Sequence, residues 1–349
     1  MEYAVTQADV NQAREEIVSF WLHTFPGWPE GKYDHFYAGN PRGHAGCWVA
    51  REEATGAVVG AVAVFPRRLL VGGEAHMAGL GGDLGVDSRH RRKGLAMELR
   101  KRMIAYRREA PLSFLYGTPN DRSARITVKA GYRIVGRTLR MVKVLRSKEY
   151  IRRVVRWGSL AYALGVPVDM ALRAMSRESG HRLDPKYTIE MPEEFDERFD
   201  ALWQRVSHEF PMIGERTAEF LRWRFTACPH KQFSTMALVE KESGAILGYV
   251  VYRRHADELH ISDVLAINLD GALHDLLAQF MLLARRLRVA KVSLFYFGTD
   301  KVRDKFRQFG FALREHHRPL IVFVDDDSPL ADLVRSEQNW YLFEGDNDT

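Results

Sequence analysis

The sequence predicts a mixed α/β protein built from two similar domains in tandem. Its 349 residues suit two domains of ordinary size, and 46% hydrophobic residues are enough to form two cores. Three pairs of segments also match in the same order along the chain. These pairs are 55–68 with 243–254, 113–118 with 293–299, and 130–144 with 309–324. An ordered repeat of this kind indicates a duplicated domain.

The repeat divides the chain into four parts. The expected parts are an N-terminal domain at 1–145, a basic and partly helical connector at 146–185, a C-terminal domain at 186–325 and an acidic tail at 326–349. The tail ends in EGDNDT, which either lies frayed in solvent or helps to attract a cationic ligand at the junction of the domains.

The elements of the first domain follow from local patterns. Glycine turns that lead into β-branched runs predict strands, and Leu95, Leu99 and Met103 recur at the spacing of one helix face. The expected strands cover 2–5, 47–53, 57–66, 76–86, 112–117 and 132–145. One helix is expected to begin near a cap at Asp9, and two others are expected at 93–109 and 121–129.

Composition narrows the class of partner and compartment. A net charge of +6 suits a polyanionic ligand but is a small excess for duplex DNA, so no nucleic acid is expected. Two cysteines in a chain of this length favour a reducing, cytoplasmic location. The first residues lack the pattern of a signal peptide, and no apolar run is long enough to span a membrane. The oligomeric state is left open.

The basic stretch at 89–93 is the strongest functional signal. A solvated charged face, a nucleic-acid patch and a cradle for phosphate all fit five cationic or titratable residues in a row. Here Gly94 follows the stretch, a strand candidate precedes it and a helix begins after it. The first amides of a helix lack intrahelical partners and attract anions, and a glycine lets a ligand approach the backbone. The phosphate cradle is therefore favoured.

The same residues carry a family resemblance. Arg91-Arg92-Lys93-Gly94-Leu95-Ala96 resembles the Arg/Gln-x-x-Gly-x-Gly/Ala signature of the GNAT superfamily of acyl-CoA-dependent N-acyltransferases. A later segment, Asn120 followed by Lys129-Ala130-Gly131-Tyr132, is similar to that family's second motif. The resemblance covers 1–145 clearly and 186–325 faintly. It implies two GNAT-like mixed-sheet domains in tandem, of which the second is degenerate.

The resemblance implies acetyl-CoA, or another acyl-CoA, as cosubstrate. Its pyrophosphate would rest on the loop, and its pantetheine arm would pair with the splayed fourth strand. The cofactor-binding residues implied are Leu84, Gly85, Val86, Arg91, Arg92, Lys93, Gly94, Leu95, Ala96 and Asn120. Asn120 alternatively serves only as the N-cap of the following helix. No metal site is expected, because the pair His316 and His317 lies on a predicted strand, where neighbouring side chains face opposite ways.

Two residues are candidates for catalysis. Asp83 lies on the fourth strand, where many members of the family carry an acidic residue, and would act as the general base. Alternatively, its carboxylate bonds a neighbouring amide. The family often has a tyrosine acid where this chain has Thr127, so Tyr116, Tyr132 or solvent must protonate the thiolate. Tyr116 is the preferred acid, because Tyr132 is expected to pack at the start of the last strand.

The second domain lacks the phosphate motif, since 262–277 contains no basic cluster. It is expected to shape the acceptor cleft between the domains. Trp223, flanked by Arg222 and Arg224, suits stacking on a sugar or holding a carboxylate, or else belongs to a surface helix with one buried aromatic ring.

The expected function is transfer of an acyl group to a primary amine of a small molecule, with amino sugars among the candidates, by direct attack on the thioester. A non-catalytic acyl-CoA sensor is an alternative. A Fem-like peptidyl transferase is another, although that group lacks the pyrophosphate motif.

Overall fold

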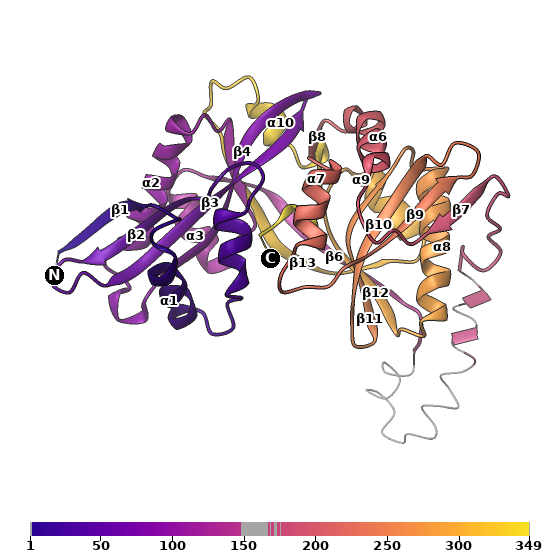
Figure 1. Cartoon of the computed structure of the whole chain (residues 1–349), viewed down its shortest axis with the longest axis horizontal. Helices are drawn as coiled ribbons and strands as arrows, with labels where there is room; N and C mark the ends of the chain where they lie inside the picture. The colour runs from indigo at the N-terminus through magenta and orange to yellow at the C-terminus, as the bar shows by residue number, and fades with distance from the viewer. Residues whose placement is uncertain (1, 148–166, 168, 171–172, 175, 349) are drawn as a thin grey trace, which may run out of the picture.

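The computed structural model describes residues 2–147, 167, 169–170, 173–174 and 176–348. Figure 1 shows the two halves of the chain side by side, with the C-terminus between them. Most of the predicted connector lies outside the described residues, so its helical pattern remains a prediction. Within the described ranges, no helix has both the length and the apolar character that are needed to cross a bilayer.

The described elements follow one another in a similar order in the two halves. The first half contains β1 (Tyr3–Ala8), α1 (Arg14–Thr24), a π-helix (Tyr33–Ala38), β2 (Gly46–Glu52), β3 (Val58–Val71), β4 (Glu74–Val86), α2 (Leu95–Glu109), β5 (Phe114–Gly117), α3 (Asp121–Lys129) and β6 (Arg133–Val144). The second contains β7 (Tyr187–Glu190), α6 (Glu197–Val206), β8 (Met212–Gly214), α7 (Ala218–Leu221), a second π-helix (Arg222–Thr226), β9 (Ser234–Glu240), β10 (Ile246–His255), β11 (Glu258–Ala266), α8 (Ala272–Arg286), β12 (Lys291–Gly298), α9 (Asp300–Gln308), β13 (Ala312–Phe323), α10 (Ala331–Val334) and β14 (Trp340–Phe343).

The predicted mixed α/β class is confirmed, and each element predicted for the first half has a counterpart. Several differ in extent by a few residues, and for two of them the structure shows the reason. β3 continues to Val71, past the predicted end at residue 66, because its last residues pair with β8 of the second half. The helix expected near Asp9 begins at Arg14, because Asp9 closes a turn. Its carboxylate accepts from the Asn11 amide at 2.9 Å, and its carbonyl accepts from the Ala13 amide at 2.9 Å.

The two halves share one continuous sheet among the described residues. The strand order is β1-β2-β3-β4-β5-β13-β6-β12-β11-β10-β9-β7. The last long strand of each half is therefore exchanged: β13 lies between β5 and β6, and β6 lies beside β12. The predicted boundaries at residues 145 and 325 mark segments of the chain, but backbone hydrogen bonds join the two halves across them.

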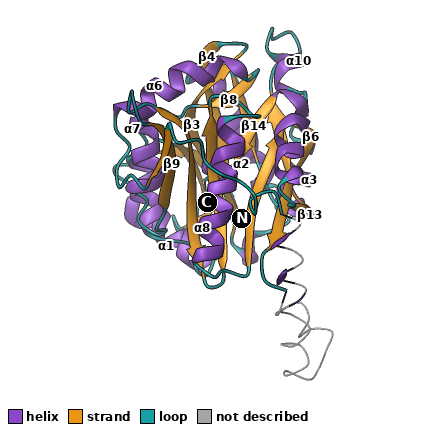
Figure 2. Ribbon diagram, turned by 90° about the vertical axis from the view of Figure 1, so that its right-hand side faces the viewer, coloured by secondary structure: helices purple, strands orange, loops and turns teal. Residues whose placement is uncertain are grey.

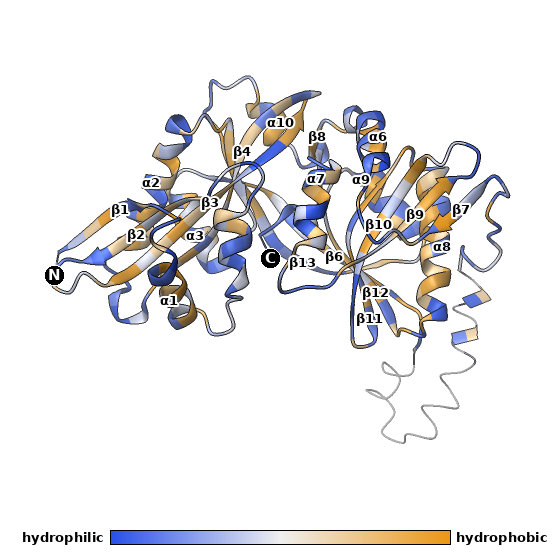
Figure 3. Ribbon diagram, viewed as in Figure 1, coloured by the Kyte–Doolittle hydropathy of each residue, from blue (hydrophilic) through white to orange (hydrophobic). Residues whose placement is uncertain are grey.

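Hydrophobic residues concentrate on the central strands, and helices lie on both faces of the sheet (Figures 2 and 3). The predicted stripe of α2 is confirmed, because Leu95, Leu99 and Met103 are buried against one face of the first half. The opposite face carries α1 and a cluster to which both halves contribute. Its members from the second half include Phe220, Trp223, Phe297, Leu320, Trp340 and Leu342. The halves thus share a hydrophobic core as well as a sheet.

The segment predicted as an acidic tail is folded into the junction of the halves. β14 pairs with β12 and with β8, and its residues Trp340 to Phe343 are at most 3% exposed. Glu344 and Asp346 are also buried. The frayed end considered from the sequence is therefore wrong, because four successive apolar residues precede the acidic ones and anchor them in the core.

Candidate active site

The site begins where β4 separates from β5. The two strands pair in parallel only over Ala78–Leu80 and Phe114–Tyr116, whereas β4 continues to Val86. Beyond this point no described strand pairs with β4 on that side, which leaves a gap in the strand pairing. The splay predicted for the fourth strand is thus present at Leu84, Gly85 and Val86.

A β-bulge at Asp83 directs side chains within this gap. Ala61 pairs with Gly85 but Ala63 pairs with Gly82, so two residues of β4 face one residue of β3. Asp83 has a φ of 45°, in the left-handed region that non-glycine residues rarely adopt. A bulge re-aims the side chain that it carries and is frequent next to active sites. The Asp83 carboxylate consequently points to the face of the sheet that carries α1.

The basic loop lies directly after β4. Arg91, Arg92, Lys93 and Gly94 are exposed, and Gly94 is the N-cap of the 15-residue helix α2. Gly94 has a φ of 82°, and no atom lies within 4 Å of the position that its Cβ would take. No side chain caps α2, so its first amides lack a side-chain acceptor at the positive end of the helix dipole. The loop has the features of an anion site.

Side-chain contacts hold the loop in place. Asp87 accepts from the Arg89 amide at 2.9 Å, and Arg91 Nε donates to the Val86 carbonyl at 3.1 Å. The hydrogen bond from the Arg89 side chain lowers the pKa of Asp87 well below its usual range, so this carboxylate is ionised at neutral pH. Lys93 Nζ donates to the Tyr3 hydroxyl at 2.7 Å. The loop is therefore organised before any ligand arrives.

Asp83 belongs to a buried cluster of two carboxylates and one ammonium. Lys32 Nζ donates to Asp83 Oδ1 at 2.8 Å and to Asp348 Oδ2 at 2.9 Å. The Tyr37 hydroxyl donates to Asp83 Oδ2 at 3.0 Å. The side chains of Lys32, Asp83 and Asp348 are only 8%, 10% and 17% exposed. We call these three residues the first-half cluster.

The pKa values of the three groups in the first-half cluster are shifted in different directions. Burial raises the pKa of Asp83 above its ordinary value, against the opposing effect of Lys32. Burial acts on Asp348 in the same direction, but Lys32 outweighs it and lowers the pKa of that carboxyl. Burial also opposes the charge of Lys32, and the two carboxylates more than compensate, which raises its pKa. Asp83 is therefore the member that most readily takes up a proton.

The other predicted residues of the first half are distributed as follows. Tyr116 is buried on the same face, and its hydroxyl lies 3.5 Å from the Asp346 carbonyl. Burial raises the pKa of Tyr116, so the phenol is protonated at neutral pH. Asn120 is the N-cap of α3 and accepts from the Ser123 amide at 2.9 Å. Its predicted contact with a cofactor remains a prediction.

Thr127 and Tyr132 lie inside the protein. Thr127 is fully buried, and its hydroxyl donates to the Ser123 carbonyl at 2.8 Å. Tyr132 packs against Phe323, with ring centroids 5.5 Å apart, under the Arg100 side chain. Thr127 thus serves the internal hydrogen bonding of α3, and Tyr132 packs at the start of the last strand as the sequence indicated.

Sequence reasoning missed Lys32 and Tyr37, and it treated Asp348 only as part of a charged tail. A lysine next to the aromatic run Tyr33 to Tyr37 was the available signal, because a cation among aromatic residues often lies in a site. The hydrogen bond between Lys32 and Asp348 was not predictable from a local pattern, since the two residues are 316 positions apart.

The second half contains a matching cluster. Gly248 pairs with Ala266 as Gly60 pairs with Val86, so Asp263 occupies the position of Asp83, three residues before the paired end. Arg216 donates to Asp263 Oδ1 at 3.0 Å and to Asp346 Oδ2 at 2.6 Å, and the Tyr249 hydroxyl donates to Asp263 at 2.8 Å. We call Arg216, Asp263 and Asp346 the second-half cluster.

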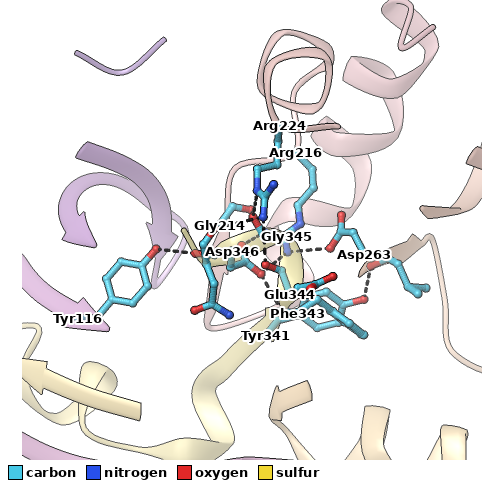
Figure 4. Close-up of polar contacts among 12 residues, drawn as sticks. Tyr116, Gly214, Arg216, Arg224, Asp263, Tyr341, Phe343, Glu344, Gly345 and Asp346 are labelled. Atoms are coloured by element: carbon cyan, nitrogen blue, oxygen red, sulfur yellow. Dashed lines mark hydrogen bonds and ion pairs between the residues drawn. The ribbon is translucent and has the colours of Figure 1, made fainter. Parts of the chain in front are cut away.

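Both clusters therefore use a carboxylate from the C-terminal segment. Figure 4 shows residues 344–346 between Tyr116 of the first half and Asp263 of the second, with Arg216 reaching both Asp263 and Asp346. The second-half cluster is the more enclosed of the two, because its side chains are at most 7% exposed. The side chains of the first-half cluster are more exposed, at 8–17%.

Among the residues that the structure describes, α8 of the second half lacks the uncapped start that α2 has in the first half. β11 separates from β12 after Ile261 and Leu294, and β14 then pairs with β12. Ser262 donates to Glu344 at 2.7 Å, so the C-terminal segment lies between the two strands. At the start of α8, the Asn268 side chain accepts from the amides of Gly271 and Ala272. The helix amides and the gap of the second half are thus occupied by the chain itself. In the first half the start of α2 has no side-chain cap, and Asn347 and Asp348 lie beside Thr118 and Gly82.

The FLRWRF motif is buried except for the exposed Arg222. Trp223 stacks on His35 at 4.8 Å and lies over the Arg67 guanidinium at 4.7 Å. Arg224 donates to the Gly345 carbonyl at 2.8 Å, and Arg222 donates to the Phe195 carbonyl. The motif therefore contributes to the junction of the halves, and its two arginines bond backbone carbonyls.

Comparisons with known proteins agree with this geometry. Residues 10–135 match the family model of the acetyltransferase (GNAT) domain. A GCN5-related N-acetyltransferase from Anabaena variabilis has a TM-score of 0.66 at 14% identity, over 93% of this chain and 73% of that chain. A tandem GNAT protein from the clavulanic acid biosynthesis pathway has a TM-score of 0.56 at 12% identity, over 92% of this chain and 98% of that chain.

A third structure widens the range of acyl groups that the fold accepts. The N-myristoyltransferase of Saccharomyces cerevisiae, solved with myristoyl-CoA, has a TM-score of 0.55 at 12% identity, over 93% of this chain and 79% of that chain. At these identities the structures show the fold alone. A search of curated proteins finds no match.

Proposed function

We propose that the chain transfers an acetyl or other acyl group from acyl-CoA to a primary amine, because residues 10–135 match the GNAT acetyltransferase family model. The acceptor is a small molecule, with amino sugars among the candidates. The first half binds the acyl donor. The second half and the C-terminal segment enclose the acceptor, because ligand pockets favour the junction of two units.

The donor site has the chemistry that acyl-CoA requires. The amides of Arg91 to Ala96 and the flanking basic side chains would hold the pyrophosphate. The free edge of β4 at Leu84, Gly85 and Val86 would pair with the pantetheine arm, and a backbone N–H near Val86 would polarise the thioester carbonyl. Asn120 would steady the donor from the start of α3. The second half offers neither feature, so each chain binds one donor.

The first-half cluster would prepare the acceptor. Lys32, Asp83 and Asp348 together carry one net negative charge when all are ionised, which attracts an ammonium group. Asp83 then takes a proton from that ammonium, directly or through a water, and the neutral amine attacks the thioester carbon. The bond from carbon to nitrogen forms, the bond from carbon to sulfur breaks, and the thiolate leaves. Tyr116 or solvent protonates the thiolate, and the second proton, which the nitrogen loses as the amide forms, returns to Tyr116 or to solvent.

The open, uncapped start of α2 beside the splayed β4 is the observation that carries this proposal. An assay of acetyl-CoA thiol release tests it across amino sugars, aminoglycosides, polyamines and peptide N-termini. Calorimetry with acetyl-CoA supplies the binding stoichiometry, and we expect one donor per chain. Binding of two donors, or of none, would contradict the proposed donor site.

A non-catalytic acyl-CoA sensor is the second candidate, and the Lys32 ammonium favours it. Lys32 already holds Asp83 and Asp348, so it occupies the place of an incoming cation. Binding of acetyl-CoA without thiol release on any acceptor would support the sensor and exclude the transferase.

A further inference from the structure

Arg67 of β3 has no hydrogen-bond partner among the described residues. Its Nε and both Nη atoms are inaccessible to solvent, and the residue is 2% exposed. Burial lowers the pKa of Arg67 to about 10, so the guanidinium is still charged at neutral pH. A buried guanidinium with five N–H groups and no acceptor is costly, and such exceptions call for an explanation.

Aromatic rings surround this guanidinium. Phe36 and Phe220 have ring centroids 5.6 Å from Arg67 Cζ, and Trp223 is closer at 4.7 Å. Cation–π contacts of this kind compensate part of the charge but provide no hydrogen-bond acceptor. Two other buried cations, in contrast, have hydrogen-bond acceptors. Lys32 bonds two carboxylates, and Arg224 bonds carbonyls of the C-terminal segment.

Arg67 and the first-half cluster lie close together. The Phe36 ring centroid is 5.6 Å from Arg67 Cζ and 5.8 Å from Lys32 Nζ. The two cations are therefore at most roughly 11 Å apart, a span that peptides of two or three residues cover at about 3.5 Å per residue. An ammonium bound by Asp83 and a carboxylate bound by Arg67 fit within one small zwitterion.

Two π-helices cover Arg67. Phe36 belongs to the π-helix at 33–38 and Trp223 to the π-helix at 222–226, and such segments are frequent at functional sites. Trp223 Nε1 donates to the His35 carbonyl at 3.1 Å and joins the two. At 8% exposed, Trp223 is the outermost of the three rings. Its displacement is the step that would open the guanidinium to a ligand.

We propose that Arg67 binds the carboxylate of the acceptor, which is then an amino acid or a short peptide with a free amine. This inference rests on the proposed function. A carboxylate fits the guanidinium because it accepts two parallel hydrogen bonds. A zwitterion also brings no net charge into the buried junction. Its ammonium would face the net negative first-half cluster, and its carboxylate would supply the hydrogen-bond acceptors that Arg67 lacks among the described residues.

The test compares two matched series of acceptors. The first contains the common free amino acids with diglycine and triglycine, and the second contains their C-terminal amides, which keep the amine but lack the carboxylate. Thiol release from acetyl-CoA and calorimetric binding are measured for both. We expect the acids to be preferred over the amides by about 10²-fold in kcat/KM.

The variants are Arg67→Met, which keeps an unbranched apolar stem among the rings, and Arg67→Lys, which keeps the charge. Arg67→Met should abolish the preference for acids, and Arg67→Lys should retain part of it. Arg222→Met is the matched control, because Arg222 is an exposed arginine on the π-helix that carries Trp223. It should leave the preference unchanged. Unchanged affinity for acetyl-CoA in each variant shows that the protein is folded.

The readouts separate the two proposals. Carboxylate-dependent binding to the wild type, lost in Arg67→Met but without thiol release, would support the inference and contradict the transferase. Equal use of acids and amides would support the transferase and overturn the inference. Failure of both series to bind or react would also overturn the inference, as would a preference that persists in Arg67→Met.

Discussion

Replacing Asp83 with asparagine removes one charge from the first-half cluster and little else. The asparagine carbonyl can still accept from Tyr37, and Lys32 keeps its bond to Asp348. The cluster changes from a net charge of −1 to zero and loses its proton acceptor. Loss of a general base lowers turnover by about 10²- to 10⁴-fold. We expect this reduction in kcat, together with unchanged affinity for acetyl-CoA, because the 91–96 loop is not altered.

The dependence on pH gives a second readout for the same variant. A base must be deprotonated, so activity falls as the pH drops through its pKa. Burial raises the pKa of Asp83, so in the wild type this fall should occur at a higher pH than an ordinary aspartate would give. In Asp83→Asn this part of the profile should disappear. The measurement is kcat/KM for one acceptor across the acidic range.

Asp263→Asn is the matched control, since Asp263 lies three residues before the paired end of β11, as Asp83 does in β4, and also bonds a tyrosine and a cation. It should lower the free energy of unfolding but leave kcat within a few-fold of the wild type. Full activity of Asp83→Asn at neutral pH, or an equal loss in both variants, would refute the role of Asp83 as base.

Three further predictions follow from the fold. Gly94→Trp should abolish acetyl-CoA binding in calorimetry, because an indole would fill the open space above the loop and the φ of 82° disfavours any side chain; unchanged affinity would contradict the donor site. Leu99→Ala should lower the free energy of unfolding by about 2–5 kcal/mol in denaturant titrations, as expected for a fully buried leucine. A fragment of residues 1–145 should fail to fold, because β5 and β6 would lose β13 between them; a soluble fragment that binds acetyl-CoA would show that the exchange is dispensable.

The sequence predicted what depends on neighbouring residues. The strand around Gly60, the stripe of α2 and the loop before Leu95 each follow from a local pattern, and all are present. The exchange of β6 and β13 was not predictable in this way, because both strands have the same pattern whichever half they join. Lys32 and Asp348 meet only after the whole sheet has formed, so their contact leaves no local signal.

The C-terminal segment was partly predictable. Trp340 to Phe343 form a run of four apolar residues, which is typical of a buried strand and not of a tail. The acidic residues around this run instead indicate a charged tail. The pattern does not predict which strand β14 pairs with, since its pairing with β12 depends on the gap that β11 leaves beside β12.

The exchange of the last strands has a consequence for how the protein is made. During synthesis β5 and β6 emerge long before residues 312–323, yet β13 must be inserted between them. The sheet of the first half therefore stays incomplete while most of the second half is translated. Contacts between such distant residues slow folding and prolong the exposure of strand edges. A ribosome-bound chain that ends before residue 312 should remain sensitive to proteases, and protection should appear in both halves at the same chain length.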